Sequence, residues 1–166
     1  MRASRPTRLA MLIAALLLTT GTNADELDER FDSDVLVIDA ATACLRFDIY
    51  VAVTREQQMR GLMFVRELPL TTGMLFVYGR EGRRSMWMRN TYIPLDIAFA
   101  SDDGSIINIA RDTVPMSEES ISSAGPASYV LELNAGVAEA LSIEPGSRLL
   151  WGPTMGISDA ERNGDE

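Results

Sequence analysis

The chain has 166 residues, with 24 acidic and 15 basic side chains and a formal net charge of −9. All of the basic residues are arginine, because lysine and histidine are both absent, and Cys44 is the only cysteine. This composition excludes Ser-His and Cys-His catalytic pairs, lysine Schiff bases, internal disulfides and zinc sites built from cysteine and histidine. The chemistry left to the chain uses carboxylates, arginines, hydroxyl groups and one thiol.

Residues 1–24 have the pattern of a secretory signal peptide. Three arginines precede an apolar run from Leu9 to Leu18, which is shorter than the roughly 20 residues that a membrane-spanning helix needs. Thr22 and Ala24 place small residues where a signal peptidase reads them. We therefore expect cleavage near Ala24 and an exported chain, periplasmic or extracellular; the alternative is a signal anchor kept in the membrane.

The mature chain is strongly acidic. Cleavage after Ala24 removes three arginines and no acidic residue, which leaves 24 acidic and 12 basic groups and a net charge of −12. Such a surface repels phosphates, so we expect no nucleic-acid partner. We also expect no integral membrane segment in the mature chain. Its polar ends predict a flexible leader over residues 25–33 and a flexible acidic tail over 153–166, on either side of a single domain at 34–152.

The mature chain opens with strand and helix signals in alternation. A short apolar run predicts a strand over 35–38, and strict alternation of apolar residues predicts a second over 45–53. Thr54 and Gln57 then have the spacing of a helix capping box. Gly61 is placed to end this short helix in a left-handed conformation.

The rest of the domain is rich in strand patterns. Further strands are predicted over 73–78, 85–88, 95–100, 106–110, 129–133 and 148–151. A polar turn at 79–82 and an Asp-Gly turn at Asp103-Gly104 join neighbouring strands as hairpins. Residues 113–126 predict a long loop, and Asn134 can cap a second short helix.

These elements predict a mainly β fold. Seven or eight short strands with one or two short helices are typical of a compact β-sandwich or a barrel-like single domain. The helices are too few and too short to cover both faces of a parallel sheet, which disfavours a doubly wound α/β fold.

The segment from Trp87 to Asp96 concentrates aromatic and polar residues between two strands. As the rim of a pocket, it would use Trp87 and Tyr92 as walls, Asn90 and Thr91 as hydrogen-bonding groups, and Asp96 as the charge. As a tight corner, it would use Asn90 and Asp96 to satisfy nearby backbone amides. The sequence leaves both interpretations open.

Arginine, methionine and cysteine residues outside this segment also have both structural and functional interpretations. Arg60 falls in the last turn of its helix, where the helix dipole favours a cation, and the alternative is a pairing with Asp96 or a bound carboxylate. The methionines lie in apolar runs, which indicates core filling more than a copper site. Cys44, without an activating histidine, is expected to be a buried small apolar residue. No metal site and no cofactor are predicted.

Four motifs in order resemble the family named domain of unknown function 192. They are RGLMF from Arg60, GMLFV from Gly73, WMRNT with IPLD ending at Asp96, and VLEL with the glycine at Gly136. The resemblance covers about Leu45 to Trp151 and implies a compact β-rich domain, often exported, without assigned catalytic residues. Arg89 stands where lysine is common in the family. The polar positions that match are Arg60, Asn90, Thr91, Asp96 and Glu132.

Two functions follow from these residues. The favoured one is a non-enzymatic domain of the cell envelope that binds a small molecule, a glycan or an envelope protein at the Trp87–Asp96 corner. Its expected ligand-binding residues are Arg60, Trp87, Asn90, Thr91, Tyr92, Asp96 and Glu132. The alternative is a carboxylate-dependent hydrolase or lyase that uses Asp96 as general acid or base. Asp96 opposite a second carboxylate across a cleft would indicate the enzyme, and Asp96 buried against backbone amides a structural role.

The signal-peptide pattern makes a testable prediction. We expect the exported protein to begin at Asp25, because Ala24 ends the small-residue cleavage motif. N-terminal sequencing of the exported protein checks this. A chain that still begins at Met1, held in the membrane, would contradict it.

Overall fold

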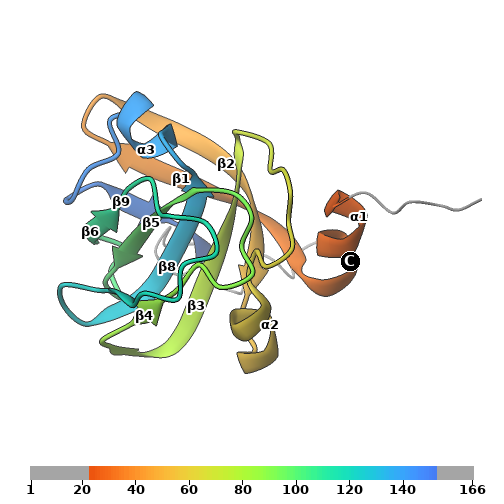
Figure 1. The fold of residues 1–166 in the computed structure, drawn as a ribbon. Coiled ribbons are helices and arrows are strands. Elements are labelled where there is room, and N and C mark those ends of the chain that lie inside the picture. Colours follow the sequence, from red (N-terminus) through yellow and green to blue (C-terminus); the bar gives the residue numbers. More distant parts are fainter. Residues whose placement is uncertain (1–22, 153–166) are drawn as a thin grey trace, which may run out of the picture.

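The computed structural model describes residues 23–152. Most of the predicted signal peptide, residues 1–22, and the predicted acidic tail at 153–166 lie outside the described residues. All of the domain that the sequence outlines at 34–152 is therefore described (Figure 1).

The described chain is mostly β, with three short helices. The helices are α1 (Asn23–Arg30), α2 (Arg55–Arg60) and α3 (Val137–Ala140). The strands are β1 (Asp32–Ala40), β2 (Ala43–Ala52), β3 (Thr72–Gly82), β4 (Ser85–Met86), β5 (Leu95–Ala100), β6 (Ile106–Ala110), β7 (Ile121–Ser122), β8 (Ala127–Asn134) and β9 (Arg148–Leu150). The predicted barrel-like single domain is confirmed.

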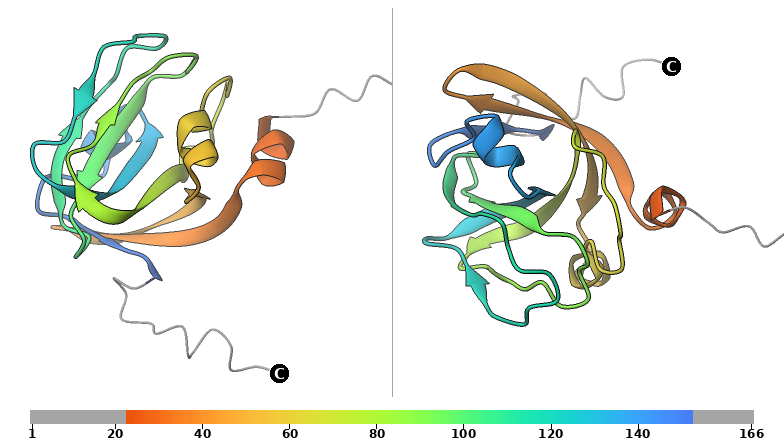
Figure 2. Two further views of the ribbon diagram at one scale, coloured as in Figure 1. Left: turned by 90° about the horizontal axis from the view of Figure 1, so that it is seen from below. Right: turned by 45° about the horizontal axis from the view of Figure 1, so that its top comes forward.

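One curved sheet forms most of the domain. Its seven strands have the order β6-β5-β8-β3-β2-β1-β9, and the strong curvature is visible in Figure 2. Every neighbouring pair is antiparallel except β2 and β3, which run parallel because α2 forms the crossover between them. The two edges nearly meet at a bridge between Ser105 and Arg148. The result is an almost closed barrel.

Glycine is required where these edges meet. Gly104 has φ +82°, and its carbonyl accepts a hydrogen bond of 2.8 Å from the Leu149 N–H. A Cβ atom at Gly104 would lie 2.2 Å from the Leu149 carbonyl oxygen. Any side chain at this position would force the two edges of the sheet apart. The glycine of the predicted Asp-Gly turn therefore also allows the barrel to close almost completely.

The sheet buries apolar side chains on both faces. The inner face, within the barrel, carries Leu36, Ile38, Phe47, Ile49, Val51, Leu75, Ala98, Leu131 and Leu133. The outer face carries Met74, Phe76, Ile97, Phe99 and Val130. Every residue of β5 is buried. The sheet therefore has two cores, and the outer one needs a cover.

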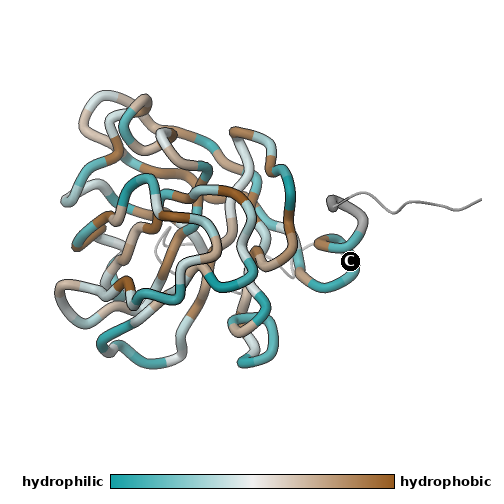
Figure 3. The backbone as a smooth tube through the Cα atoms, viewed as in Figure 1, coloured by the Kyte–Doolittle hydropathy of each residue, from teal (hydrophilic) through white to brown (hydrophobic). Residues whose placement is uncertain are grey.

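Short helices and irregular segments provide this cover. Leu27 and Phe31, on and just after α1, pack into the outer core together with Leu62 and Val65 of the loop at 61–71, and Met88. Helices α1 and α2 lie on the same side of the curved sheet (Figures 1 and 2). Hydrophilic residues are frequent on α2, while the central strands are more hydrophobic (Figure 3). None of the helices in residues 23–152 is long and apolar enough to cross a membrane.

The N-terminal leader is the largest departure from the predicted elements. Residues 25–33 were expected to be a flexible leader, but they form most of α1 and the first residues of β1. Leu27 and Phe31 are only 3% and 5% exposed. These two apolar residues anchor an otherwise acidic segment. Two apolar residues are too few to produce a periodic hydrophobic pattern in the sequence, so the helix was not predicted.

Several local predictions are also wrong. The turn expected at 79–82 is the continuation of β3, and β4 pairs with β7 instead of β3. Asn134 does not cap α3; its amide donates 2.9 Å to the Leu68 carbonyl, and Gly136 is the N-cap residue. Cys44 is exposed near the turn between β1 and β2.

Candidate functional site

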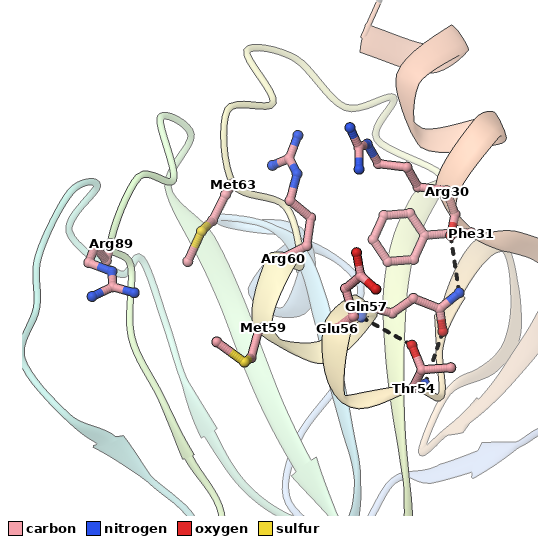
Figure 4. A pocket seen from close by; sticks show the side chains of 9 residues that line it. All are labelled: Arg30, Phe31, Thr54, Glu56, Gln57, Met59, Arg60, Met63 and Arg89. Atoms are coloured by element: carbon pink, nitrogen blue, oxygen red, sulfur yellow. Dashed lines mark hydrogen bonds between the residues drawn. The ribbon is translucent and has the colours of Figure 1, made fainter.

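A cavity of about 550 Å³ opens beside α2. It is lined by Arg30, Phe31, Thr54, Glu56, Gln57, Met59, Arg60, Met63 and Arg89. Figure 4 shows Arg89 on one side and Arg30 with Phe31 on the other, with α2 between them. Three arginines thus surround one cavity of a chain whose net charge is −9. Its volume is within the range of small-molecule sites, roughly 300–1,000 Å³.

Helix α2 is held firmly at this cavity. The predicted capping box is confirmed: the Gln57 N–H donates to the Thr54 hydroxyl, and the Thr54 N–H donates to the Gln57 side chain. The Gln58 amide donates 2.8 Å to the Val77 carbonyl of β3. Gly61 ends the helix at φ 44° and ψ −141°, so its φ is positive as predicted but its conformation is not left-handed helical. These contacts fix the direction in which Arg60 leaves the helix.

Arg60 is a mostly buried cation with spare hydrogen-bonding capacity. Its side chain is 19% exposed, and one nitrogen binds the Glu26 carboxylate at 2.5 Å. Its guanidinium lies 4.9 Å from the centre of the Phe64 ring. The other terminal nitrogen, Nη1, is buried and has no hydrogen-bond partner among the described residues. The pairing of Arg60 with Asp96 that the sequence suggested is wrong.

Glu26 links two of the arginines. Its carboxylate binds Arg60 and also lies 3.3 Å from Arg30. The hydrogen bond from Arg60 is the largest cause that lowers the pKa of the Glu26 carboxyl below its usual value. The arginines beside the cavity therefore already hold one carboxylate, supplied by the chain itself.

Arg89 has the same unfilled capacity as Arg60. Its guanidinium stacks 4.0 Å from the centre of the Trp87 ring, and its Nε is buried without a hydrogen-bond partner among the described residues. Leaving a buried donor unpaired costs about 1–3 kcal/mol. Arg60 and Arg89, which each have one such donor, line the same cavity; a third buried donor without a partner among the described residues, Arg111 Nη1, belongs to a residue outside it.

The loops around the cavity carry backbone strain. Phe64 and Met116 have φ of 68° and 63°, a region that bulky side chains rarely adopt, and Asn90 has φ of 59°, which asparagine tolerates better. They belong to three segments tied together by backbone hydrogen bonds, from the Phe64 N–H to the Asn90 carbonyl and from the Met116 N–H to the Thr91 carbonyl. Strain of this kind clusters at functional sites. It supports the placement of the site at this rim.

A narrow cavity of about 20 Å³ lies next to the larger one and shares Met59, Arg60 and Met63 with it. It is lined by Gln58, Met59, Arg60, Gly61, Leu62, Met63, Phe76, Met86, Trp87, Thr91 and Glu132. Met59, Met63 and Met86 line this cavity, whereas Met74 and Met88 fill the core as predicted. Four of the seven predicted site residues, Arg60, Trp87, Thr91 and Glu132, meet here.

Glu132 is the unusual member of this set. It is 4% exposed, and its carboxyl takes part in no hydrogen bond or ion pair among the described residues. Burial away from water raises the pKa of Glu132 to about 8. The folded protein therefore binds the Glu132 proton more tightly than the unfolded chain does. The resulting contribution to the free energy of unfolding is fully present below pH 4.5, the usual pKa of the group, and is lost as the pH rises through about 8.

Asp96 lies on the other face of the sheet. Glu132 is paired across the strands with Ile97, whereas Asp96 is paired with Leu133. Because side chains alternate between faces, Glu132 points to the outer core and Asp96 to the inner one. Asp96 is 2% exposed, and its two oxygens accept hydrogen bonds of 2.9 Å from the Asp112 and Ala138 N–H groups. By the criterion set from the sequence, Asp96 is structural.

The remaining predicted residues lie near the cavities without a shared role. The Asn90 amide lies 3.9 Å from the Met63 sulfur. Tyr92 is 39% exposed, packs edge-on against Phe64 and carries the Arg66 guanidinium 5.1 Å from its ring centre. It lines neither cavity. Within residues 23–152, no three acidic or cysteine side chains converge as metal ligands would.

Sequence reasoning missed Arg30, Met59 and Arg89 as lining residues. Arg89 had a local signal, because an arginine two residues after a tryptophan can stack on it. Arg30 had none, since its contribution depends on α1 folding against the sheet.

Comparison with known proteins yields a family and two solved structures. The model of domain of unknown function 192, described as "Uncharacterized ACR", matches residues 36–151. A crystal structure from Sinorhizobium meliloti 1021, described as a "putative transcription regulator", is 38% identical with a TM-score of 0.72, covering 75% of this chain and 96% of that one. A protein of unknown function from Novosphingobium aromaticivorans DSM 12444 is 38% identical with a TM-score of 0.70, covering 72% and 85%. No curated protein matches the chain.

The two bonds to Asp96 make its structural role testable. We expect Asp96→Ala to lower the free energy of unfolding by about 1–3 kcal/mol for each of the two backbone donors left unpaired. Asp96→Asn, which keeps one acceptor oxygen, should lose less. Urea unfolding measures both, with the exposed Asp48→Ala as control. An Asp96→Ala variant as stable as this control would contradict the assignment.

Proposed function

We propose that this chain, which belongs to the family of domain of unknown function 192, binds a small organic anion in the cavity beside α2. It acts as a non-enzymatic binding domain. The observation that carries this proposal is that two arginines lining one cavity, Arg60 and Arg89, each have a buried guanidinium nitrogen without a hydrogen-bond partner among the described residues.

An anion suits these groups for a chemical reason. The planar guanidinium presents parallel N–H donors that match the two oxygens of a carboxylate or the oxygens of a phosphate. Glu26 occupies Nη2 of Arg60, and Nη1 has no hydrogen-bond partner among the described residues. Trp87, stacked beneath Arg89, holds that guanidinium in place and offers an apolar surface beside it.

Binding is favoured over catalysis by the carboxylates present. Hydrolases that work through carboxylates use two of them on opposite sides of the scissile bond. Each cavity is lined by one carboxylate among the described residues, Glu132 in the narrow cavity and Glu56 in the larger one, so neither cavity holds such a pair. Asp96 faces the inner core, so the hydrolase or lyase built on Asp96 is not proposed.

We propose that the domain works outside the cytoplasm. The support is the signal-peptide pattern of residues 1–24. Cleavage after Ala24 would keep Glu26 and Arg30, so the mature chain would retain the α1 residues that contact Arg60. The acidic surface also argues against DNA binding, so the regulatory role named for the Sinorhizobium protein is not extended to this chain.

The proposal is tested by the arginines themselves. A thermal-shift screen of the mature chain against small carboxylates and phosphates should identify anions that stabilise it. For such an anion, Arg60→Gln and Arg89→Gln should each weaken binding about 10- to 100-fold, as expected when a charged hydrogen bond worth about 1.5–3 kcal/mol is lost. Titration calorimetry measures the affinities.

Arg46→Gln is the matched control, because Arg46 is 63% exposed on β2 and pairs with Asp48 away from the cavity. It should bind the anion as the parent does. Melting temperatures show whether each variant is folded. Arginine variants that fold and bind as tightly as the control would contradict the proposed site.

A further inference from the structure

Glu132 occupies a core position of the outer sheet face. Its neighbours across the strands are Met74 of β3 and Ile97 of β5, both fully buried and apolar. An apolar side chain would fill this position without cost. The carboxyl loses its hydration there and gains no partner among the described residues, so the fold alone does not account for it.

The carboxyl faces the narrow cavity. A space of about 20 Å³ exceeds the roughly 10–15 Å³ that a single water requires. It therefore admits one oxygen-sized group. Because Met59, Arg60 and Met63 line both cavities, a group at Glu132 can belong to a ligand whose other end lies among the arginines.

We propose that Glu132 donates a hydrogen bond to a carbonyl oxygen of the ligand, so that the ligand class is an organic anion with a carbonyl group at its far end. Oxo acids and acylated amino acids have this chemistry. This inference rests on the proposed function, and it adds the recognition of a second group on the same ligand.

The protonation of Glu132 makes it a donor. A protonated carboxyl offers one O–H, whereas an ionised carboxylate only accepts. With its pKa raised to about 8, Glu132 is mostly protonated at neutral pH and ionised at about pH 9. A carbonyl oxygen, which only accepts, bonds to the first form and not to the second.

Two other ionisable side chains lie near Glu132, and their charges could also affect binding at high pH. Arg60 lines the same cavity, and its guanidinium already binds Glu26. Tyr78 of β3 senses the Glu132 charge, and burial raises the pKa of its hydroxyl above 10, so it stays protonated at about pH 9. Glu132 is thus the group that titrates at the cavity.

The experiment compares matched pairs of acids on the mature chain. The oxo acids are 4-oxopentanoate, 5-oxohexanoate and 6-oxoheptanoate, which vary the span between the two groups; pentanoate, hexanoate and heptanoate carry a methylene in place of the carbonyl. At about pH 6, one oxo acid should bind about tenfold more tightly than its partner, as one hydrogen bond predicts. At about pH 9 this preference should disappear.

Two variants assign the preference to Glu132. Glu132→Gln keeps a donor that does not titrate, so its preference should persist at both pH values. Glu132→Met fills the position without a donor and should show no preference at either. A preference that survives in Glu132→Met, or that does not change with pH in the parent, would overturn the inference.

The outcomes also separate this inference from the proposed function. If both members of every pair bind equally and Arg60→Gln abolishes their binding, the anion site stands and the role of Glu132 is wrong. If none of these acids binds the parent, the inference is overturned, and the proposed function then depends on the wider anion screen.

Discussion

Burial on both faces of the central strands is the constraint on which the rest of this structure depends. A curved sheet that nearly closes on itself encloses one core, but β3, β5 and β8 also present apolar side chains outward. Apolar surface of this extent must be removed from water. The chain has only short helices with which to do so, and it completes the cover with irregular segments at 61–71 and 87–94.

A cover of this kind creates a site. Irregular segments pack less regularly than helices, and Phe64 and Asn90 within them have positive φ angles. Between them lie arginines whose guanidinium groups are partly buried and incompletely paired. The same cover removes Glu132 from water and raises its pKa to about 8. The backbone strain, the unpaired guanidinium donors and the protonated carboxyl therefore have one cause, which is the need to cover a sheet that is apolar on both faces.

The sequence predicts much of the fold and a smaller part of the site. The segments that flank the Asp-Gly turn place β5 and β6 at their observed bounds, and the Thr54–Gln57 spacing identifies the cap of α2, because these signals are local. The site depends on strand register, which local patterns do not specify. Asp96 and Glu132 look equivalent in the sequence, yet pairing puts them on opposite faces of the sheet. Arg30 and Glu26 reach the cavity only because Leu27 and Phe31 anchor α1.

The protonation of Glu132 is the central physical claim, and carbon-13 NMR of the glutamate carboxyl groups measures it most directly. The Glu132→Gln variant identifies the Glu132 signal by its disappearance. The account predicts that this signal titrates with a midpoint near pH 8. A Glu132 midpoint between about 4 and 5, as in model peptides, would show that the carboxyl is hydrated or paired, and would contradict the account.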